Sequence, residues 1–99
     1  MGTDARPAGG LTTAPVLEVE LVTRRGCHLC DLALSMLERE AERRPLRVVL
    51  IDVDADAVLL RRYDLRVPVV RAAGRDVCEG MIMPLQLRAA LDEVAALRG

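Results

Sequence analysis

Residues 22–30, VTRRGCHLC, mark the point at which the hydrophobic pattern of this chain changes its period. In the segment before them, VLEVELV at 16–22, apolar and acidic side chains alternate, which predicts a β-strand. After Cys27, apolar residues recur three and four positions apart, which predicts an amphipathic helix. Cys27 and Cys30 are therefore predicted to lie at a strand-to-helix turn.

This first predicted helix has an apolar face and a charged face. Glu40 belongs to the charged face, where it is placed to pair with Arg44 four residues later. Pro45 is expected to end the helix, because the residue before a proline is pushed out of the helical region. The predicted apolar face consists of Leu29, Leu32, Ala33, Met36, Leu37 and Ala41.

A second strand and a second helix follow. The segment LRVVLIDVD at 46–54 is a near-continuous apolar run, which is typical of a strand covered on both faces. The segment AVLLRRY at 57–63 predicts a short helix capped by Asp54 or Asp56. A strand, helix and strand in this order predict a right-handed parallel crossover.

The last third of the chain predicts a hairpin and a closing helix. Two extended segments, 66–72 and 75–80, are separated by Ala73 and Gly74, which is typical of a hairpin. The closing helix is expected to start near Pro84. The predicted fold is α/β with the order βαβαββα, in which a four-stranded mixed sheet carries helices on both faces.

Length and composition limit the organisation of the protein and its partners. The 99 residues fit one domain, predicted at 15–99, and residues 1–14 are predicted to form a flexible N-terminal lead. With 14 basic and 15 acidic residues, the chain lacks the positive charge that binds nucleic acid. It contains neither a membrane-spanning apolar run nor the apolar core of a signal peptide, so we expect a cytoplasmic monomer with no membrane partner.

The two close cysteines allow three interpretations: a metal site, an inert core pair and a disulfide-exchange couple. A structural zinc site needs four ligands, whereas this chain offers one cysteine pair, the lone Cys78 and His28 inside the pair. A metal or cluster bridging two chains stays open as an alternative. The spacing favours exchange, because two sulfurs one helical turn apart reach bonding distance. We therefore predict no metal and no cofactor.

The predicted position assigns different roles to the two cysteines. The positive end of the helix dipole stabilises an anion, so Cys27 is expected to have a lowered pKa and to attack a disulfide as the thiolate. Cys30, further inside the helix, is expected to resolve the mixed disulfide. His28, Arg24 and Arg25 are candidates for adding positive potential, with solvated surface residues as the alternative for each. Arg24 is the preferred helper.

Over residues 16–97 the chain resembles the small bacterial glutaredoxin-like proteins of the thioredoxin superfamily. The resemblance rests on VTRRGCHLC, VVLIDVD, YDLRVPVV and GRDVCEG in this order. It implies a thioredoxin-like fold and a thiol–disulfide oxidoreductase that acts on a protein disulfide or a low-molecular-weight thiol. It also implies a cis peptide bond before Pro68, with the backbone N–H and C=O of Val67 available to pair with an extended substrate.

The chain departs from the glutathione-binding members of this superfamily at several positions. Val22 replaces a tyrosine, Arg66 replaces a threonine, and CEG at 78–80 replaces a glycine pair, while Arg24 keeps a basic position. These departures leave only part of a glutathione site and argue against glutathione as the substrate thiol. A metal or iron–sulfur binding module and a redox-silent adaptor stay open as alternative functions. Cys78 is interpreted as a small core residue rather than a redox thiol, on a strand where Val77 and Cys78 point to opposite faces.

Overall fold

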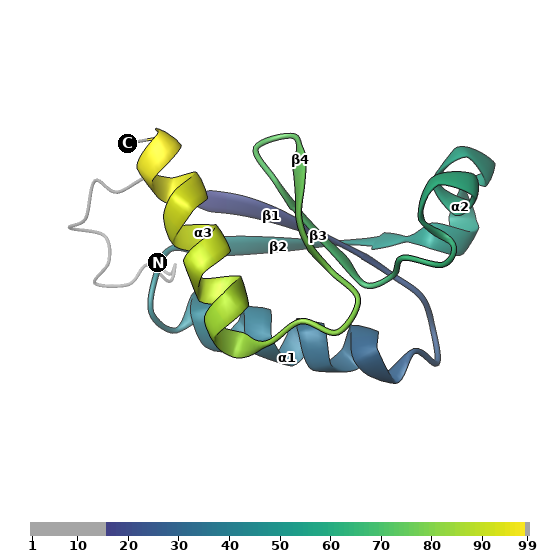
Figure 1. Ribbon diagram of the computed structural model, residues 1–99, viewed down its shortest axis with the longest axis horizontal. Coiled ribbons are helices and arrows are strands. Elements are labelled where there is room, and N and C mark those ends of the chain that lie inside the picture. Colours follow the sequence, from purple (N-terminus) through teal and green to yellow (C-terminus); the bar gives the residue numbers. More distant parts are fainter. Residues whose placement is uncertain (1–15, 99) are drawn as a thin grey trace, which may run out of the picture.

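The computed structural model describes residues 16–98, which form an α/β fold with the predicted order of elements (Figure 1). The predicted lead, 1–14, lies outside the described residues. The elements are β1 (Leu17–Thr23), α1 (His28–Ala41), β2 (Leu46–Asp52), the 3₁₀ turn η1 (Val53–Ala55), α2 (Ala57–Tyr63), β3 (Val69–Ala72), β4 (Arg75–Glu79) and α3 (Pro84–Arg98).

The four strands form one mixed sheet in the order β2-β1-β3-β4. β1 pairs in parallel with β2 over seven residues and antiparallel with β3, which in turn pairs antiparallel with β4. The predicted crossover and hairpin are thereby confirmed. Ala73 and Gly74 connect the hairpin strands with positive φ angles of 54° and 74°, which suits a two-residue turn between twisted strands.

The larger hydrophobic core lies between one face of the sheet and the helices α1 and α3. It joins side chains of β1, β3 and β4 to one stripe of each helix. Its buried members are Leu17, Val19, Leu21, Ala33, Leu37, Val70, Ala72, Cys78, Ile82, Leu87, Leu91 and Val94. Since the sequence contains no phenylalanine and no tryptophan, this core depends on close packing of aliphatic side chains.

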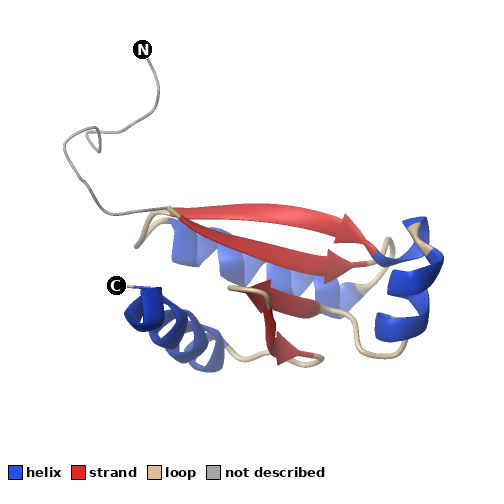
Figure 2. Cartoon of the chain, turned by 90° about the horizontal axis from the view of Figure 1, so that it is seen from above, coloured by secondary structure: helices blue, strands red, loops and turns tan. Residues whose placement is uncertain are grey.

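The opposite face of the sheet is covered at one end only. Figure 2 shows α2 beyond the arrowheads of the two long strands, and a second core of Val22, Val53, Tyr63 and Val69 lies at this end. Helices therefore lie on both faces, as predicted, although α2 has only seven residues. Within residues 16–98, no helix is long and apolar enough to cross a membrane.

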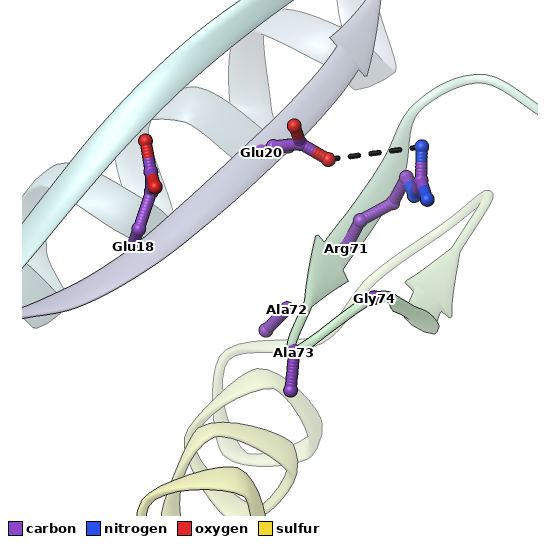
Figure 3. Close-up of a pocket in the computed structure, with 6 residues that line it drawn as sticks. All are labelled: Glu18, Glu20, Arg71, Ala72, Ala73 and Gly74. Carbon is purple, nitrogen blue, oxygen red and sulfur yellow. Dashed lines mark ion pairs between the residues drawn. The ribbon is translucent and has the colours of Figure 1, made fainter.

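The uncovered part of this face is polar and holds a shallow pocket (Figure 3). Glu18 and Glu20 of β1 and Arg71 of β3 line it, together with the residues of the β3–β4 turn. The Arg71 guanidinium lies 3.7 Å from the Glu20 carboxylate. The pocket lies towards the amino-terminal end of β1, whereas the cysteines follow the carboxyl-terminal end. It is therefore separate from the CxxC turn.

The buried stripe of α1 differs from the predicted one. Leu32, expected on the apolar face, is 42% exposed, whereas Glu40, expected on the charged face, is only 4% exposed. The Glu40 carboxylate accepts a hydrogen bond from Arg88 Nε of α3 at 3.0 Å. It also lies 3.4 Å from Arg44 Nη2, which confirms the predicted i,i+4 pair. A buried ion-pair cluster thus joins α1 to α3.

The fourth strand also differs from the prediction. A β-bulge interrupts the β3–β4 pairing, so that Val70 is opposite Cys78 while Arg71 is opposite Asp76. The extra residue is Val77, and both Val77 and Cys78 contact the larger core. The expectation that these two side chains point to opposite faces is therefore wrong, because a bulge breaks the strict alternation of a strand.

The Glu40 cluster gives a first prediction. Glu40→Ala is expected to lower the free energy of unfolding by about 2–3 kcal/mol, because it leaves Arg44 and Arg88 without their shared carboxylate between α1 and α3. Urea unfolding followed by circular dichroism measures this loss. Glu18→Gln, which weakens an exposed pair with Arg47, serves as the control and should cost less than about 0.5 kcal/mol. Equal losses in the two variants would contradict the assigned role of Glu40.

Candidate active site

Cys27 is the N-cap residue of α1. Its backbone is extended, with φ −101° and ψ 109°, and its Sγ accepts a hydrogen bond from the Cys30 N–H at 3.2 Å. The Cys27 carbonyl accepts from the Asp31 N–H at 3.1 Å and so begins the helix. Gly26, with φ 71°, provides the left-handed turn that leads from β1 into this cap. The sulfur thus lies where a helix end stabilises negative charge.

The two cysteines lie close together but differ in accessibility. Their Cα atoms are 5.2 Å apart, which falls within the range that disulfides span, and the sulfurs lie within bonding distance. The Cys30 side chain is 1% exposed, whereas Cys27 is partly exposed at the protein surface. A molecule that approaches from solvent can therefore reach Cys27 more easily than Cys30.

His28 and Arg25 lie within two residues of Cys27 in the sequence. His28 is the first residue of α1, and Arg25 precedes Gly26 in the connecting turn; both are exposed. Neither side chain forms a salt bridge with any residue in 16–98. They are the cationic or potentially cationic side chains nearest to Cys27 along the chain.

Arg24 has a different environment from the one expected of a thiolate helper. Its Nε and Nη2 donate to the Asp54 carboxylate at 3.1 and 3.2 Å, and Nη2 also donates to Asp64 Oδ1 at 2.6 Å. The hydrogen bonds that Arg24 donates to Asp54 and Asp64 raise the pKa of this guanidinium further above its usual value. One positive charge meets two negative charges, so Arg24 brings no net positive potential. It connects the turn before Cys27 to η1 and to the end of α2.

Pro68 lies directly beside this turn. The antiparallel pair Val22–Val69 places Pro68 opposite the residues that lead from β1 to the cysteines. The Val67–Pro68 peptide bond is cis, and the Pro68 carbonyl accepts from the Gly80 N–H at 2.9 Å. The Val67 N–H donates to the Tyr63 carbonyl at 3.2 Å, so it is already engaged and, contrary to the expectation, not free to pair with a substrate.

A second arginine cluster lies next to Pro68, and the sequence patterns did not predict it. Arg66 Nη2 donates to Glu79 Oε1 at 2.7 Å and to Asp76 Oδ2 at 2.9 Å. The buried Tyr63 hydroxyl donates to the other oxygen of Asp76 at 3.0 Å. The guanidinium of Arg66 also lies 5.0 Å from the centre of the Tyr63 ring. These contacts attach the segment before Pro68 to β4.

Arg66 helps to lower the pKa values of the two carboxylates in this cluster. A hydrogen bond from Arg66 holds the pKa of Glu79 below its ordinary value. Burial alone would raise the pKa of Asp76, but hydrogen bonds from Arg66 and Tyr63, with the charge of Arg71, outweigh it and lower the pKa. Both groups therefore favour the charged form in the folded protein.

Cys78 is a core residue, as interpreted from the sequence. It is buried between the sheet and the helices, and burial raises the pKa of its thiol. A buried thiol that resists ionisation is a poor nucleophile. Within residues 16–98, no three His, Cys, Asp or Glu side chains are grouped to hold a metal ion.

A thioredoxin-like fold is defined by a four-stranded sheet with this topology, by Pro68 directly before the inner strand β3 and by a CxxC pair at the start of α1. The family model for the glutaredoxin-like domain (DUF836) matches residues 18–92, and the chain belongs to this family. No curated protein matches the sequence.

Two solved structures support this assignment. The X-ray structure of the Northeast Structural Genomics target protein XcR50 from X. campestris is 37% identical, with a TM-score of 0.66, and the match covers 76% of this chain and 96% of that one. A mutant thioredoxin from Halobacterium salinarum NRC-1 is 26% identical, with a TM-score of 0.60, and the match covers 80% of this chain and 74% of that one.

The Arg66 cluster predicts a pH-dependent contribution to stability. Because the pKa values of Asp76 and Glu79 are lowered on folding, the stabilisation by Arg66 is present above the ordinary carboxyl pKa of about 4 and is lost as the pH falls through the lowered values. Arg66→Gln is therefore expected to lower the free energy of unfolding by a larger amount at pH 7 than at pH 2.5, as measured by urea unfolding.

Arg75→Gln is the matched control for this prediction. Arg75 lies on the same hairpin, is exposed and has no ion pair with any other residue in 16–98. Its replacement should change stability little at either pH. If Arg66→Gln lowers the free energy of unfolding by the same amount at pH 7 and at pH 2.5, this result would argue against the pairing of Arg66 with the two carboxylates.

Proposed function

We propose that this protein is a thiol–disulfide oxidoreductase in which Cys27 is the nucleophile and Cys30 the resolving cysteine. The single observation that carries the proposal is the N-cap position of Cys27, where the Sγ accepts the Cys30 N–H and remains partly exposed. Membership of the glutaredoxin-like family and the likeness to a thioredoxin support the same chemistry.

In the proposed reaction, the Cys27 thiolate attacks one sulfur of the substrate disulfide. A bond forms between Cys27 Sγ and that sulfur, and the second substrate sulfur leaves as a thiolate, which takes up a proton. The Cys30 thiol then loses its proton, and its sulfur attacks Cys27 Sγ to form the Cys27–Cys30 bond. The first substrate sulfur is released as a thiol, so the substrate gains two electrons and two protons and the protein loses them.

The neighbouring residues have supporting roles in this proposal. His28 and Arg25 provide positive potential on the exposed side of the thiolate, which favours its charged form. Arg24, held by Asp54 and Asp64, keeps the turn before Cys27 in place. Val67 and Pro68 form the wall against which the substrate disulfide lies beside Cys27.

The proposed substrates are a protein disulfide or a low-molecular-weight disulfide, and the electrons are carried by the cysteines alone, without metal or organic cofactor. We propose a bacterial, cytoplasmic protein that acts as a monomer. The near-zero net charge of −1 argues against nucleic acid as a partner. In a reducing compartment, close cysteine pairs are usually catalytic or metal-binding rather than structural.

A redox titration tests the proposal. Purified protein equilibrated in thiol buffers of defined potential should show one two-electron transition of the Cys27–Cys30 pair, detected by alkylation and mass spectrometry. Cys27→Ser should abolish this transition, whereas Cys78→Ala should leave its midpoint unchanged, because Cys78 lies in the core. Absence of an intramolecular disulfide at any potential, or masking of both thiols by bound metal, would exclude the exchange function in favour of a binding module.

The N-cap geometry makes a separate prediction about reactivity. In the reduced protein, the rate at which iodoacetamide alkylates Cys27 should rise with pH. The midpoint of this rise should lie below the pKa of about 8.5 of a free cysteine, because the Cys30 N–H and the helix end stabilise the thiolate. The pH dependence of the alkylation rate, measured in a Cys78→Ala background, reports this value. A midpoint at or above about 8.5 would mean that the helix end does not activate the thiol.

A further inference from the structure

The short helix α2 has a buried side and an exposed side. Figures 1 and 2 show α2 at one end of the molecule. Its inner side packs against the second core through Leu59 and the buried Tyr63. Val58, however, is 61% exposed, and Leu65, two residues beyond the end of the helix, is 95% exposed. Two large apolar side chains at this end of the molecule are therefore open to solvent.

Two arginines stand between these apolar side chains on the same face. Positions i, i+3, i+4 and i+7 share one face of a helix, and here they are Val58, Arg61, Arg62 and Leu65. The helical turn extends towards Leu65, because the Asp64 N–H donates to the Leu60 carbonyl at 2.9 Å. We call these four residues, 58, 61, 62 and 65, the α2 stripe. It combines two apolar side chains with two cationic ones.

The two arginines of the α2 stripe have no carboxylate partner in the part of the chain that the structure describes. Arg61 and Arg62 are exposed, and neither forms an ion pair with another residue in 16–98. The Arg62 guanidinium lies 5.5 Å from the centre of the Tyr63 ring, an arrangement in which a cation is attracted to the ring face. Both guanidinium groups can therefore receive a carboxylate from another molecule.

The carboxylates around the α2 stripe, in contrast, are already engaged. Arg24 and Arg66 each meet two of them, and a fifth accepts hydrogen bonds from the first N–H groups of α2; they are Asp54, Asp64, Asp76, Glu79 and Asp56. Arg71 also lies 3.4 Å from Asp76, but it is shared with Glu20. The surroundings of the stripe therefore carry no broad positive field. A nucleic acid or an anionic membrane needs such a field, whereas a partner with a few well-placed carboxylates does not.

A surface pocket of about 480 Å³ adjoins the α2 stripe. Its lining residues are Leu60, Arg61, Arg62, Asp64, Leu65 and Arg66. The backbone of this pocket is held in place, because Arg24 Nη1 donates to the Asp64 carbonyl at 3.3 Å and the Arg66 N–H donates to the Tyr63 carbonyl at 2.8 Å. A side chain that enters a preformed pocket of this kind orders little of the protein, which favours binding.

We propose that the α2 stripe and its pocket form a docking surface for an acidic amphipathic helix of a partner protein. Carboxylates of the partner pair with Arg61 and Arg62, and an apolar side chain of the partner packs against Leu65 in the pocket. A helix fits because it presents acidic and apolar side chains three and four residues apart, which is the spacing of the stripe. The surface contains no residue of the CxxC turn, so this inference goes beyond the exchange function and does not depend on it.

Binding of a synthetic peptide tests the inference. The probe is a fluorescein-labelled helical peptide of about 15 residues, without cysteine, that carries leucines at three- and four-residue spacing with glutamates between them. Fluorescence anisotropy with the full-length protein measures its Kd. Two matched peptides, with glutamine in place of glutamate or serine in place of leucine, should each bind at least about fivefold more weakly.

Variants connect this binding to the α2 stripe. The double variant Arg61→Gln with Arg62→Gln and the single variant Leu65→Ser should each raise the Kd of the acidic peptide about five- to tenfold. Arg75→Gln and Leu97→Ser are the matched controls, because these residues are exposed on β4 and α3. They should change the Kd less than about twofold. Circular dichroism spectra identical to the wild type show that each variant is folded.

Several outcomes would overturn the docking surface. They are no binding of the acidic peptide up to about 1 mM, equal binding of the glutamine peptide, and an unchanged Kd in the double variant. Binding to phosphatidylserine vesicles in place of the peptide would assign the stripe to a membrane. Dimerisation in sedimentation equilibrium that the double variant abolishes would assign it to a second copy of this chain. The redox titration tests the exchange function separately, so either proposal can fail while the other stands.

Discussion

The pairing of β1 along both of its edges is the constraint on which the rest of this structure depends. β1 has β2 on one side and β3 on the other, and Val19, Leu21 and Val22 are completely buried. Because β1 and β2 are parallel, the chain must cross back over the sheet between them, and α1 makes this crossing. The start of α1 therefore lies at the carboxyl end of the central strand, where Cys27 becomes the helix cap.

The two arginine clusters fix the surroundings of this cap. Arg24 joins the turn before Cys27 to η1 and α2, and Arg66 joins the segment before Pro68 to β4. Both ends of the α2–β3 connection are thus tied to the scaffold by ion pairs. Since the short α2 buries only its Tyr63 side fully, these ion pairs supply contacts that packing alone does not. Arg24, which was expected to assist the thiolate, holds the turn before Cys27 in place through these ion pairs.

The sequence predicts those features that depend on neighbours a few residues away. The order of strands and helices, the Asp56 cap of α2 and the Ala73–Gly74 turn all follow from local preferences, and they are correct. The errors concern partners that are distant in sequence. Glu40 looks like a surface residue in its helix, and its hydrogen bond with Arg88, 48 positions later, helps to make its burial tolerable. The bulge at Val77 likewise depends on how β4 pairs with β3, and a strand pattern cannot reveal that.

The candidate site likewise has one part that local sequence patterns predict and another part that they do not. The chemistry of Cys27 needs only a helix start and a second cysteine one turn later, both of which are visible in the short segment 22–30. The surroundings of Pro68, in contrast, are assembled from the α2–β3 and β4–α3 connections, which meet through the Gly80–Pro68 hydrogen bond. The ion pairs of Arg66 with Asp76 and Glu79 also attach the segment before Pro68 to β4. These contacts join separate elements of the chain, and sequence patterns predict such contacts least well.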